Sequence, residues 1–205
     1  MAGKALNGPA SNKRGGGKKR ELAQGKLVDI YVWKASTREV LAKITGFHRR
    51  AISQLAFSPS GKRLLSIGQD DQNSVAVYDW ATQSMLGNAK VDPAKVFSAA
   101  WKSETEFSTC GMKHMKTFTM SGANINGKKG SYLKSLGNVA MNCVNYVCNG
   151  VLVTGIQNGG LVKWNGNSAA KPIMKHTDAI WAIENIGAQS FVTGGNDGKI
   201  IKWNS

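Results

Sequence analysis

Cysteine, proline and long apolar runs are scarce in this sequence, and these shortages exclude several classes of protein. Three cysteines (Cys110, Cys143 and Cys148) form neither an even set nor a Cys-x-x-Cys pair, so we interpret them as reduced thiols of a cytosolic protein. No run of about 18 apolar residues occurs, so no helix is expected to span a bilayer. The N-terminus is charged but has no apolar segment behind it, so it is not a secretory signal.

Acidic residues are also few. The 205 residues carry 27 Lys and Arg against 12 Asp and Glu, which leaves a net charge of +15. Residues 1–26 hold seven basic side chains against Glu21 alone, and residues 27–205 hold twenty against eleven. A basic chain is drawn to polyanions by long-range attraction. Nucleic acid, anionic lipid and acidic protein surfaces are therefore the candidate partners at this stage.

Short β-rich runs that end in an aromatic residue recur along the chain. The closing aromatics are Trp33, Tyr78, Phe118, Trp164 and Trp203, at intervals of 45, 40, 46 and 39 residues. A period of about 40–45 residues is typical of a β-propeller blade with four antiparallel strands. Alternation of apolar and polar residues, together with Gly, Asn and Asp in the turns, argues against a solenoid of helix pairs.

This period predicts an all-β, incomplete β-propeller over residues 27–205, with about four blades plus part of another. We expect two strands near 28–33 and 39–44, and then three full blades near 48–89, 94–136 and 139–173. A last blade of three strands near 179–203 brings the arc to about seventeen strands. Open edges leave backbone groups unpaired. We therefore expect a fragment of a longer chain, a truncated gene model, or an arc that another chain completes.

The last repeat resembles a WD40 repeat, because His176 begins it, Gly194–Gly198 forms its turn and Trp203 closes it. More specifically, residues 27–205 resemble the echinoderm microtubule-associated protein-like family. The matching segments are Gly46–His48, Phe57–Gly61, Gly68–Asp71, Val77–Trp80, Thr109–His114, Lys128–Gly130, Thr154–Gly155 and Gly194–Gly198. The resemblance implies further blades before residue 1. It also favours residues 1–26 as a loop between two strands over the other interpretation, a flexible basic tail.

The resemblance further implies a hydrogen-bonded structural tetrad of His, Ser or Thr, Asp and Trp within a blade. The expected tetrads are His176, Thr193, Asp197 and Trp203 in the last blade, and His48, Ser66, Asp71 and Tyr78 in the first full one. A His, a Thr and an Asp in one repeat superficially suggest a hydrolytic triad. Mutual satisfaction of buried polar groups accounts for them without catalysis.

Two other motifs do not carry the chemistry that they suggest. Residues 122–129 approximate a phosphate-binding loop, but Lys129 stands where that loop needs Ser or Thr, and a strand pattern follows instead of a helix. A group of soft donors is suited to Cu(I), but alternation along a strand would divide it between two faces. These donors are Cys110, Met112, His114, Met115 and Met120. We expect no catalytic, metal or cofactor site.

Basic side chains in residues 1–26 and at blade edges are the candidate partner-binding residues. They are Lys13, Arg14, Lys18, Lys19, Arg20, Arg49, Arg50, Lys62, Arg63, Lys128 and Lys129. A charge of +15 exceeds what solubility requires. The resemblance implies acidic tubulin or axonemal proteins as partners, and a non-catalytic docking role on microtubules of the cytoplasm or cilium. A scaffold in an RNA–protein assembly is the alternative, although the basic clusters lack interleaved aromatics for base stacking.

Overall fold

The computed structural model describes residues 27–133, 136–137 and 139–204, so the predicted tail or loop at residues 1–26 lies outside the described residues. Within the described part, eighteen strands form five antiparallel sheets. No apolar helix of membrane-spanning length occurs in this part of the chain. The strands are β1 (Ile30–Trp33), β2 (Val40–Ile44), β3 (Ile52–Phe57), β4 (Arg63–Gly68), β5 (Val75–Asp79), β6 (Ser84–Ala89), β7 (Val96–Trp101), β8 (Glu106–Gly111), β9 (His114–Ser121), β10 (Asn124–Lys129), β11 (Met141–Val147), β12 (Val151–Ile156), β13 (Gly160–Asn165), β14 (Ser168–Ala169), β15 (Ile173–Met174), β16 (Ile180–Gly187), β17 (Ser190–Gly195) and β18 (Ile200–Asn204).

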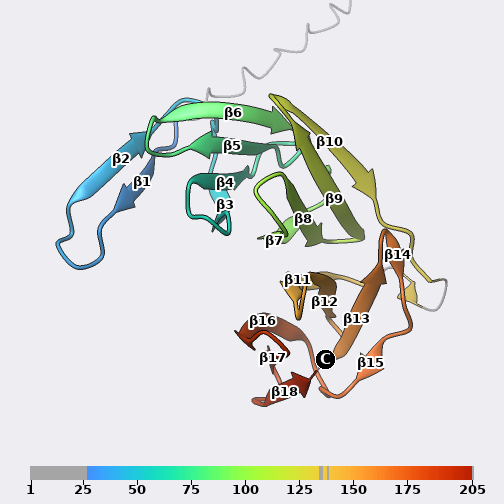
Figure 1. Cartoon of the computed structure of the whole chain (residues 1–205). Coiled ribbons are helices and arrows are strands. Elements are labelled where there is room, and N and C mark those ends of the chain that lie inside the picture. Colours follow the sequence, from blue (N-terminus) through green and yellow to red (C-terminus); the bar gives the residue numbers. More distant parts are fainter. Residues whose placement is uncertain (1–26, 134–135, 138, 205) are drawn as a thin grey trace, which may run out of the picture.

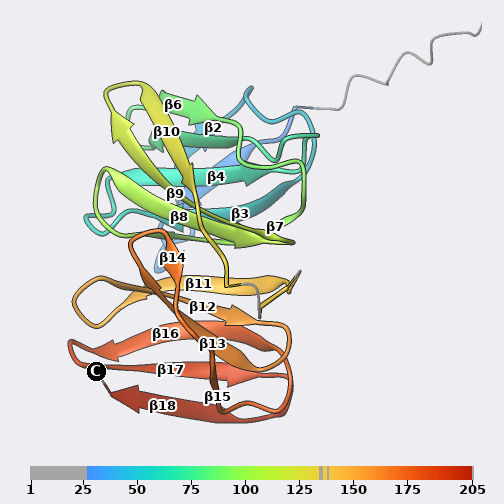
Figure 2. The same cartoon turned by 90° about the vertical axis from the view of Figure 1, so that its right-hand side faces the viewer.

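Each sheet is a meander in which consecutive strands pair with one another, except that β15 pairs with β13 and not with β14. The sheets are β1–β2, β3–β6, β7–β10, β11–β15 and β16–β18. They follow one another around an arc, with β3, β7, β11 and β16 toward its inner side and β6 and β10 toward its outer side (Figure 1). Seen from the side, the sheets lie one above another like layers (Figure 2). The arc stays open within the described residues, and the predicted incomplete β-propeller is confirmed.

One blade differs from the expected four strands. In the sheet that begins with β11, the outer strand is divided into β14 and β15, and both pair with β13. Ala169 lies opposite Trp164, whereas Ile173 lies opposite Leu161. Pro172 stands between the two short strands and has no N–H to donate to a ladder. The division raises the count to eighteen strands in the described residues, one more than the sequence predicted.

The hydrophobic cores lie between neighbouring sheets. One core joins β3–β6 to β7–β10, and in it the rings of Phe107 and Phe118 stack with their centroids 4.9 Å apart. In the second strands β4, β8 and β12 the first residue is partly buried, and every residue after it is buried. Strands that are covered on both faces need nearly continuous runs of small and apolar residues, which explains why these segments lack a polar face.

The main-chain hydrogen bonds between the named strands remain within each sheet. Side-chain amides connect the innermost strands of neighbouring sheets. Gln54 Nε2 on β3 donates to the Phe97 carbonyl on β7 at 2.7 Å. Asn145 Nδ2 on β11 donates to the Ile183 carbonyl on β16, and Asn185 Nδ2 donates back to Tyr146, both at 2.9 Å. These bonds fix the spacing of successive blades at the inner rim.

Candidate functional site

A buried hydroxyl recurs on the second strand of four successive sheets. The residues are Ser66 on β4, Thr109 on β8, Thr154 on β12 and Thr193 on β17, and none of them has solvent exposure. Each hydroxyl faces the side chain of a ring-bearing residue, His or Trp, within its own blade. A buried polar group requires such a partner, so this position is where each blade concentrates its polar contacts.

In the last blade the structure brings together His176, Thr193, Asp197 and Trp203. His176 Nε2 lies 2.8 Å from Thr193 Oγ1, and His176 Nδ1 lies 2.8 Å from Asp197 Oδ1. Trp203 Nε1 donates to Thr193 Oγ1 at 2.9 Å. Because an ionised carboxylate only accepts, His176 Nδ1 carries a proton and donates to Asp197 Oδ1. Each of the four side chains therefore has a hydrogen-bond partner within the cluster.

Asp197 also holds the turn that precedes β18. Its carboxylate accepts the Thr177 N–H at 3.1 Å and the Lys199 N–H at 3.2 Å. The hydrogen bond from His176 is the main cause that lowers the pKa of Asp197 to about 2. The His176 side chain has no exposure and that of Asp197 is only 4 % exposed. The cluster is thus a clamp between a turn and a strand, closed to a substrate.

The first full blade contains a different version of this cluster. His48 Nε2 lies 2.7 Å from Ser66 Oγ. Burial raises the pKa of Tyr78, and its hydrogen bond with Ser66 opposes this shift. Burial lowers the pKa of His48, and the charge of Asp70 opposes that shift. His48 Nδ1 has no hydrogen-bond partner within the described residues.

The assignment of Asp71 to this cluster is wrong. The Asp71 side chain is 78 % exposed, and its Oδ1 forms an ion pair with Arg50 Nη1 at 2.7 Å. The preceding residue, Asp70, points inward and accepts the Gln72 N–H, the Ser74 N–H and the Ser74 hydroxyl at 2.9–3.1 Å. Adjacent residues in a tight turn point in different directions, so Asp70 binds groups of its own turn while Asp71 forms a surface ion pair, and neither carboxylate bonds to His48 as Asp197 bonds to His176.

The two middle blades use partners that sequence reasoning missed. Thr109 Oγ1 lies 3.3 Å from His114 Nε2, and Trp164 Nε1 donates to Thr154 Oγ1 at 3.0 Å. Burial lowers the pKa of His114 to about 4. The sequence position of the hydroxyl residues could have identified these clusters. In all four blades the hydroxyl residue lies one or two residues before a glycine near the end of the second strand, at Ser66, Thr109, Thr154 and Thr193.

The predicted basic residues do not gather into one patch. Lys13, Arg14, Lys18, Lys19 and Arg20 lie outside the described residues. Arg49 and Arg50 precede β3 and Lys62 follows it, so a six-residue strand of about 20 Å separates them. Arg50 is paired with Asp71, and Arg63 Nη1 donates to the Glu104 carbonyl of the next blade at 2.6 Å.

Arg63 is partly buried and joins two blades through this hydrogen bond, so its role as a docking residue stays a prediction. Arg49 and Lys62 are exposed, and so are Lys128 and Lys129 on the outer strand β10. The exposed basic residues therefore offer several separate points of contact on the arc.

A groove of about 560 Å³ lies between the β7–β10 and β11–β15 sheets. Lys102, Lys128 and Lys163 line it together with one acidic residue, Glu106. Sequence reasoning selected Lys128 alone among these residues. Lys102 and Lys128 come from one blade and Lys163 comes from the next, so the packing of two blades places these residues around the groove.

The soft donors are divided between the interior and the surface. Cys110 and Met115 are fully buried, whereas Met112 is exposed. Cys110 Sγ donates to the Met141 carbonyl at 3.3 Å, and burial raises the pKa of its thiol. Burial likewise raises the pKa of Cys143 to about 12. Within the described residues, no three His, Cys, Asp or Glu side chains form a group that could hold a metal ion.

Four-stranded meander blades with a clamp of His, Thr, Asp and Trp define a WD40 β-propeller protein. A family described as the first β-propeller of echinoderm microtubule-associated protein matches residues 9–205. The chain belongs to this family, and the resemblance inferred from its motifs is confirmed.

Individual relatives agree with this assignment. Echinoderm microtubule-associated protein-like 1 from Homo sapiens is 28% identical over 183 residues, which cover 85% of this chain and 22% of that protein. The 77 kDa echinoderm microtubule-associated protein from Strongylocentrotus purpuratus is 25% identical over 184 residues, covering 85% and 27%. The chain therefore spans about a quarter of the length of the relatives that it matches.

A solved structure supports the fold independently. The crystal structure of the Cps50 (Swd1) β-propeller domain from Myceliophteria thermophila superposes with a TM-score of 0.73. Its sequence identity is 16%, and the match covers 86% of this chain and 58% of that one. At this identity the similarity concerns the β-propeller fold alone.

Proposed function

We propose that this chain is a non-catalytic docking segment of a microtubule-associated protein, which binds tubulin or axonemal proteins through its blade loops and basic surface. The observation that carries the proposal is the family match over residues 9–205, together with relatives whose names describe microtubule-associated proteins. In this role the chain acts on the cytoskeleton of the cytoplasm or on the axoneme of a cilium.

The charge distribution is consistent with docking at several points. Arg49, Lys62 and Lys129 are exposed at different places on the arc, and the whole chain has a net charge of +15. Attraction between such a surface and an acidic partner is long-ranged and is screened by salt. We therefore expect binding that depends on many weak contacts and weakens steeply as ionic strength rises.

We also propose that the two ends of the arc pack against further blades, from the rest of a longer chain or from another chain. Trp33 and Val40 are opposite each other on β1 and β2, and each is 57 % exposed. On the last sheet, Ile200 is 80 % exposed and Trp181 is 53 % exposed. Exposed apolar surface of this kind marks an interaction site, and the relatives are several times longer than this chain.

Co-sedimentation of the full chain with microtubules tests the docking role. The chain is expected to pellet at low salt, to dissociate as salt increases, and to pellet less with microtubules whose acidic tubulin tails have been removed by protease. Absence of pelleting at low salt would refute the proposal. Retention of RNA without pelleting would favour the alternative scaffold in an RNA–protein assembly.

A further inference from the structure

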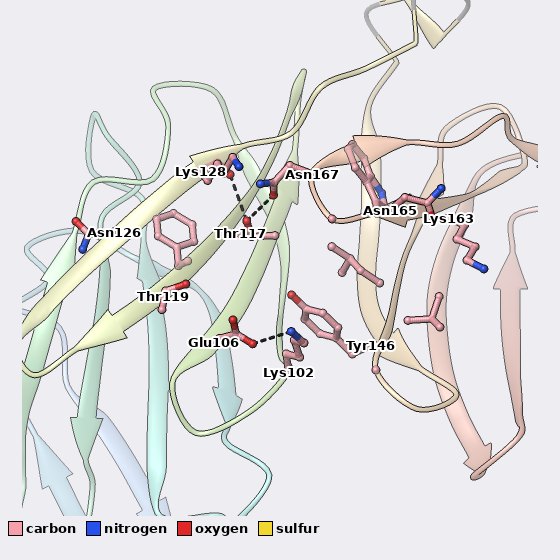
Figure 3. Close-up of a pocket in the computed structure, with 16 residues that line it drawn as sticks. Lys102, Glu106, Thr117, Thr119, Asn126, Lys128, Tyr146, Lys163, Asn165 and Asn167 are labelled. Atoms are coloured by element: carbon pink, nitrogen blue, oxygen red, sulfur yellow. Dashed lines mark hydrogen bonds and ion pairs between the residues drawn. The ribbon is translucent and has the colours of Figure 1, made fainter.

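We propose that the groove between the β7–β10 and β11–β15 sheets binds an extended acidic segment of a partner protein. The inference deepens the proposed function and rests on it in one respect, namely that the segment belongs to the docking partner. The groove itself is defined by the residues that line it and by its volume of about 560 Å³. Figure 3 shows its two walls, with β9 and β10 on one side and β11–β13 on the other.

The charge of the groove is positive. Lys102 Nζ is paired with Glu106 Oε2 at 2.7 Å, and Glu106 is the only acidic residue among those that line the groove. The ion pairs found within the described residues involve neither Lys128 nor Lys163. Lys128 on β10 lies on the wall opposite β13, whereas the Lys163 side chain lies on the same face of β13 as Leu161 and is directed away from Lys128 (Figure 3). Lys128 is therefore the cation, free of an ion pair within the described residues, that a carboxylate of a ligand in the groove would meet.

Two hydrogen bonds across the blade boundary fix the width of the groove. Thr117 Oγ1 on β9 donates to Asn167 Oδ1, in the turn after β13, at 2.7 Å. Ser108 on β8 and Tyr146 on β11 share a hydrogen bond of 2.6 Å between their hydroxyls. A site with fixed walls binds its ligand at a lower entropic cost. The groove is thus preorganised before a partner arrives.

The surroundings of the lysines favour a peptide over single-stranded nucleic acid. Thr119 and Asn126 supply uncharged polar side chains that can bond to a peptide backbone. The aromatic rings of Phe118 and Trp164 also line the groove, but these residues are only 2 % and 4 % exposed. Rings covered to this extent give bases no platform for stacking.

The test measures binding of fluorescein-labelled octaglutamate to the full chain by fluorescence anisotropy. Lys128→Glu is compared with Lys129→Glu, since successive residues of a strand point to opposite faces and only Lys128 lines the groove. Both lysines are exposed, and both variants change the net charge equally. We expect the Kd to rise about tenfold or more for Lys128→Glu and less than about threefold for Lys129→Glu.

Lys163→Glu is a second control, because its exposed side chain lies on the face of β13 that is directed away from Lys128, and we expect its Kd to rise less than about threefold. An equal loss in Lys128→Glu and in either control, or no saturable binding by the unmodified chain, would overturn the inference. Microtubule pelleting is measured separately on the same variants. Pelleting without Lys128-dependent octaglutamate binding rejects the groove and leaves the proposed function intact. Lys128-dependent binding without pelleting supports the groove and rejects the proposed function.

Discussion

Replacement of Thr193 by valine tests whether the clamp of the last blade stabilises the fold. Thr193→Val preserves the shape of the side chain but removes the hydroxyl, which lies 2.8 Å from His176 Nε2 and 2.9 Å from Trp203 Nε1. Both rings then lose a hydrogen-bond partner. Thr193 itself has no exposure, so water cannot replace the hydroxyl without a rearrangement of the blade.

The expected cost follows from the number of groups that lose a partner. An unsatisfied buried polar group costs about 1–3 kcal/mol, and Trp203 is only partly buried, so we expect about 2–4 kcal/mol for Thr193→Val. Thr154→Val is the matched control, because it deprives Trp164 alone and should cost about 1–2 kcal/mol. Thr193→Ser keeps the hydroxyl and should cost about 1 kcal/mol for the lost methyl group.

The free energy of unfolding is measured by urea denaturation, followed by tryptophan fluorescence at neutral pH. A lower midpoint at an unchanged slope indicates a change in stability. The reasoning fails if Thr193→Val is no more destabilising than Thr193→Ser. It also fails if Thr154→Val costs as much as Thr193→Val, because the His176 contact would then contribute nothing.

Two further predictions concern titration and the turn before β5. Burial lowers the pKa of His114 to about 4 from an ordinary value of 6.5, so the unfolded chain binds more protons between these pH values. Up to about 3 kcal/mol of stability is therefore present above pH 6.5 and is lost as the pH falls to 4. His114→Gln should flatten this slope in melting temperatures measured from pH 7.5 to 4, and an unchanged slope would contradict the assignment. Asp70→Ala, which removes three hydrogen bonds, should cost about 1–3 kcal/mol, whereas Asp71→Ala should stay within about 0.5 kcal/mol; equal urea midpoints for the two variants would contradict the assignment of the inward carboxylate.

The sequence was sufficient for the blade pattern because the pattern is local and repeated. A buried aromatic residue such as Trp164 stands near the end of the third strand in each blade. The repeat of about 40–45 residues is therefore visible in the sequence without knowledge of the packing. His176 and Asp197 could also be predicted, since the last blade resembles a WD40 repeat and this resemblance implies the four residues of the clamp.

Other features depend on geometry that residue types do not encode. Asp70 and Asp71 are chemically the same, and only the path of the backbone through the turn decides which one points inward. Arg63 donates to a main-chain carbonyl of the next blade, an acceptor that every residue possesses. The groove combines Lys102 and Lys128 of one blade with residues of the next blade, so it forms only when the two blades are packed.

The amide links at the inner rim bear on how such a chain can evolve. In the links from β3 to β7 and from β11 to β16 the donor is a side chain, such as Gln54 or Asn145, and the acceptor is a main-chain carbonyl of the neighbouring blade. The receiving blade therefore needs no particular residue at the acceptor position. A blade can be duplicated, exchanged or allowed to diverge while its neighbour continues to hold it. At these two boundaries, the side-chain amide on the donor strand is the residue that the link requires.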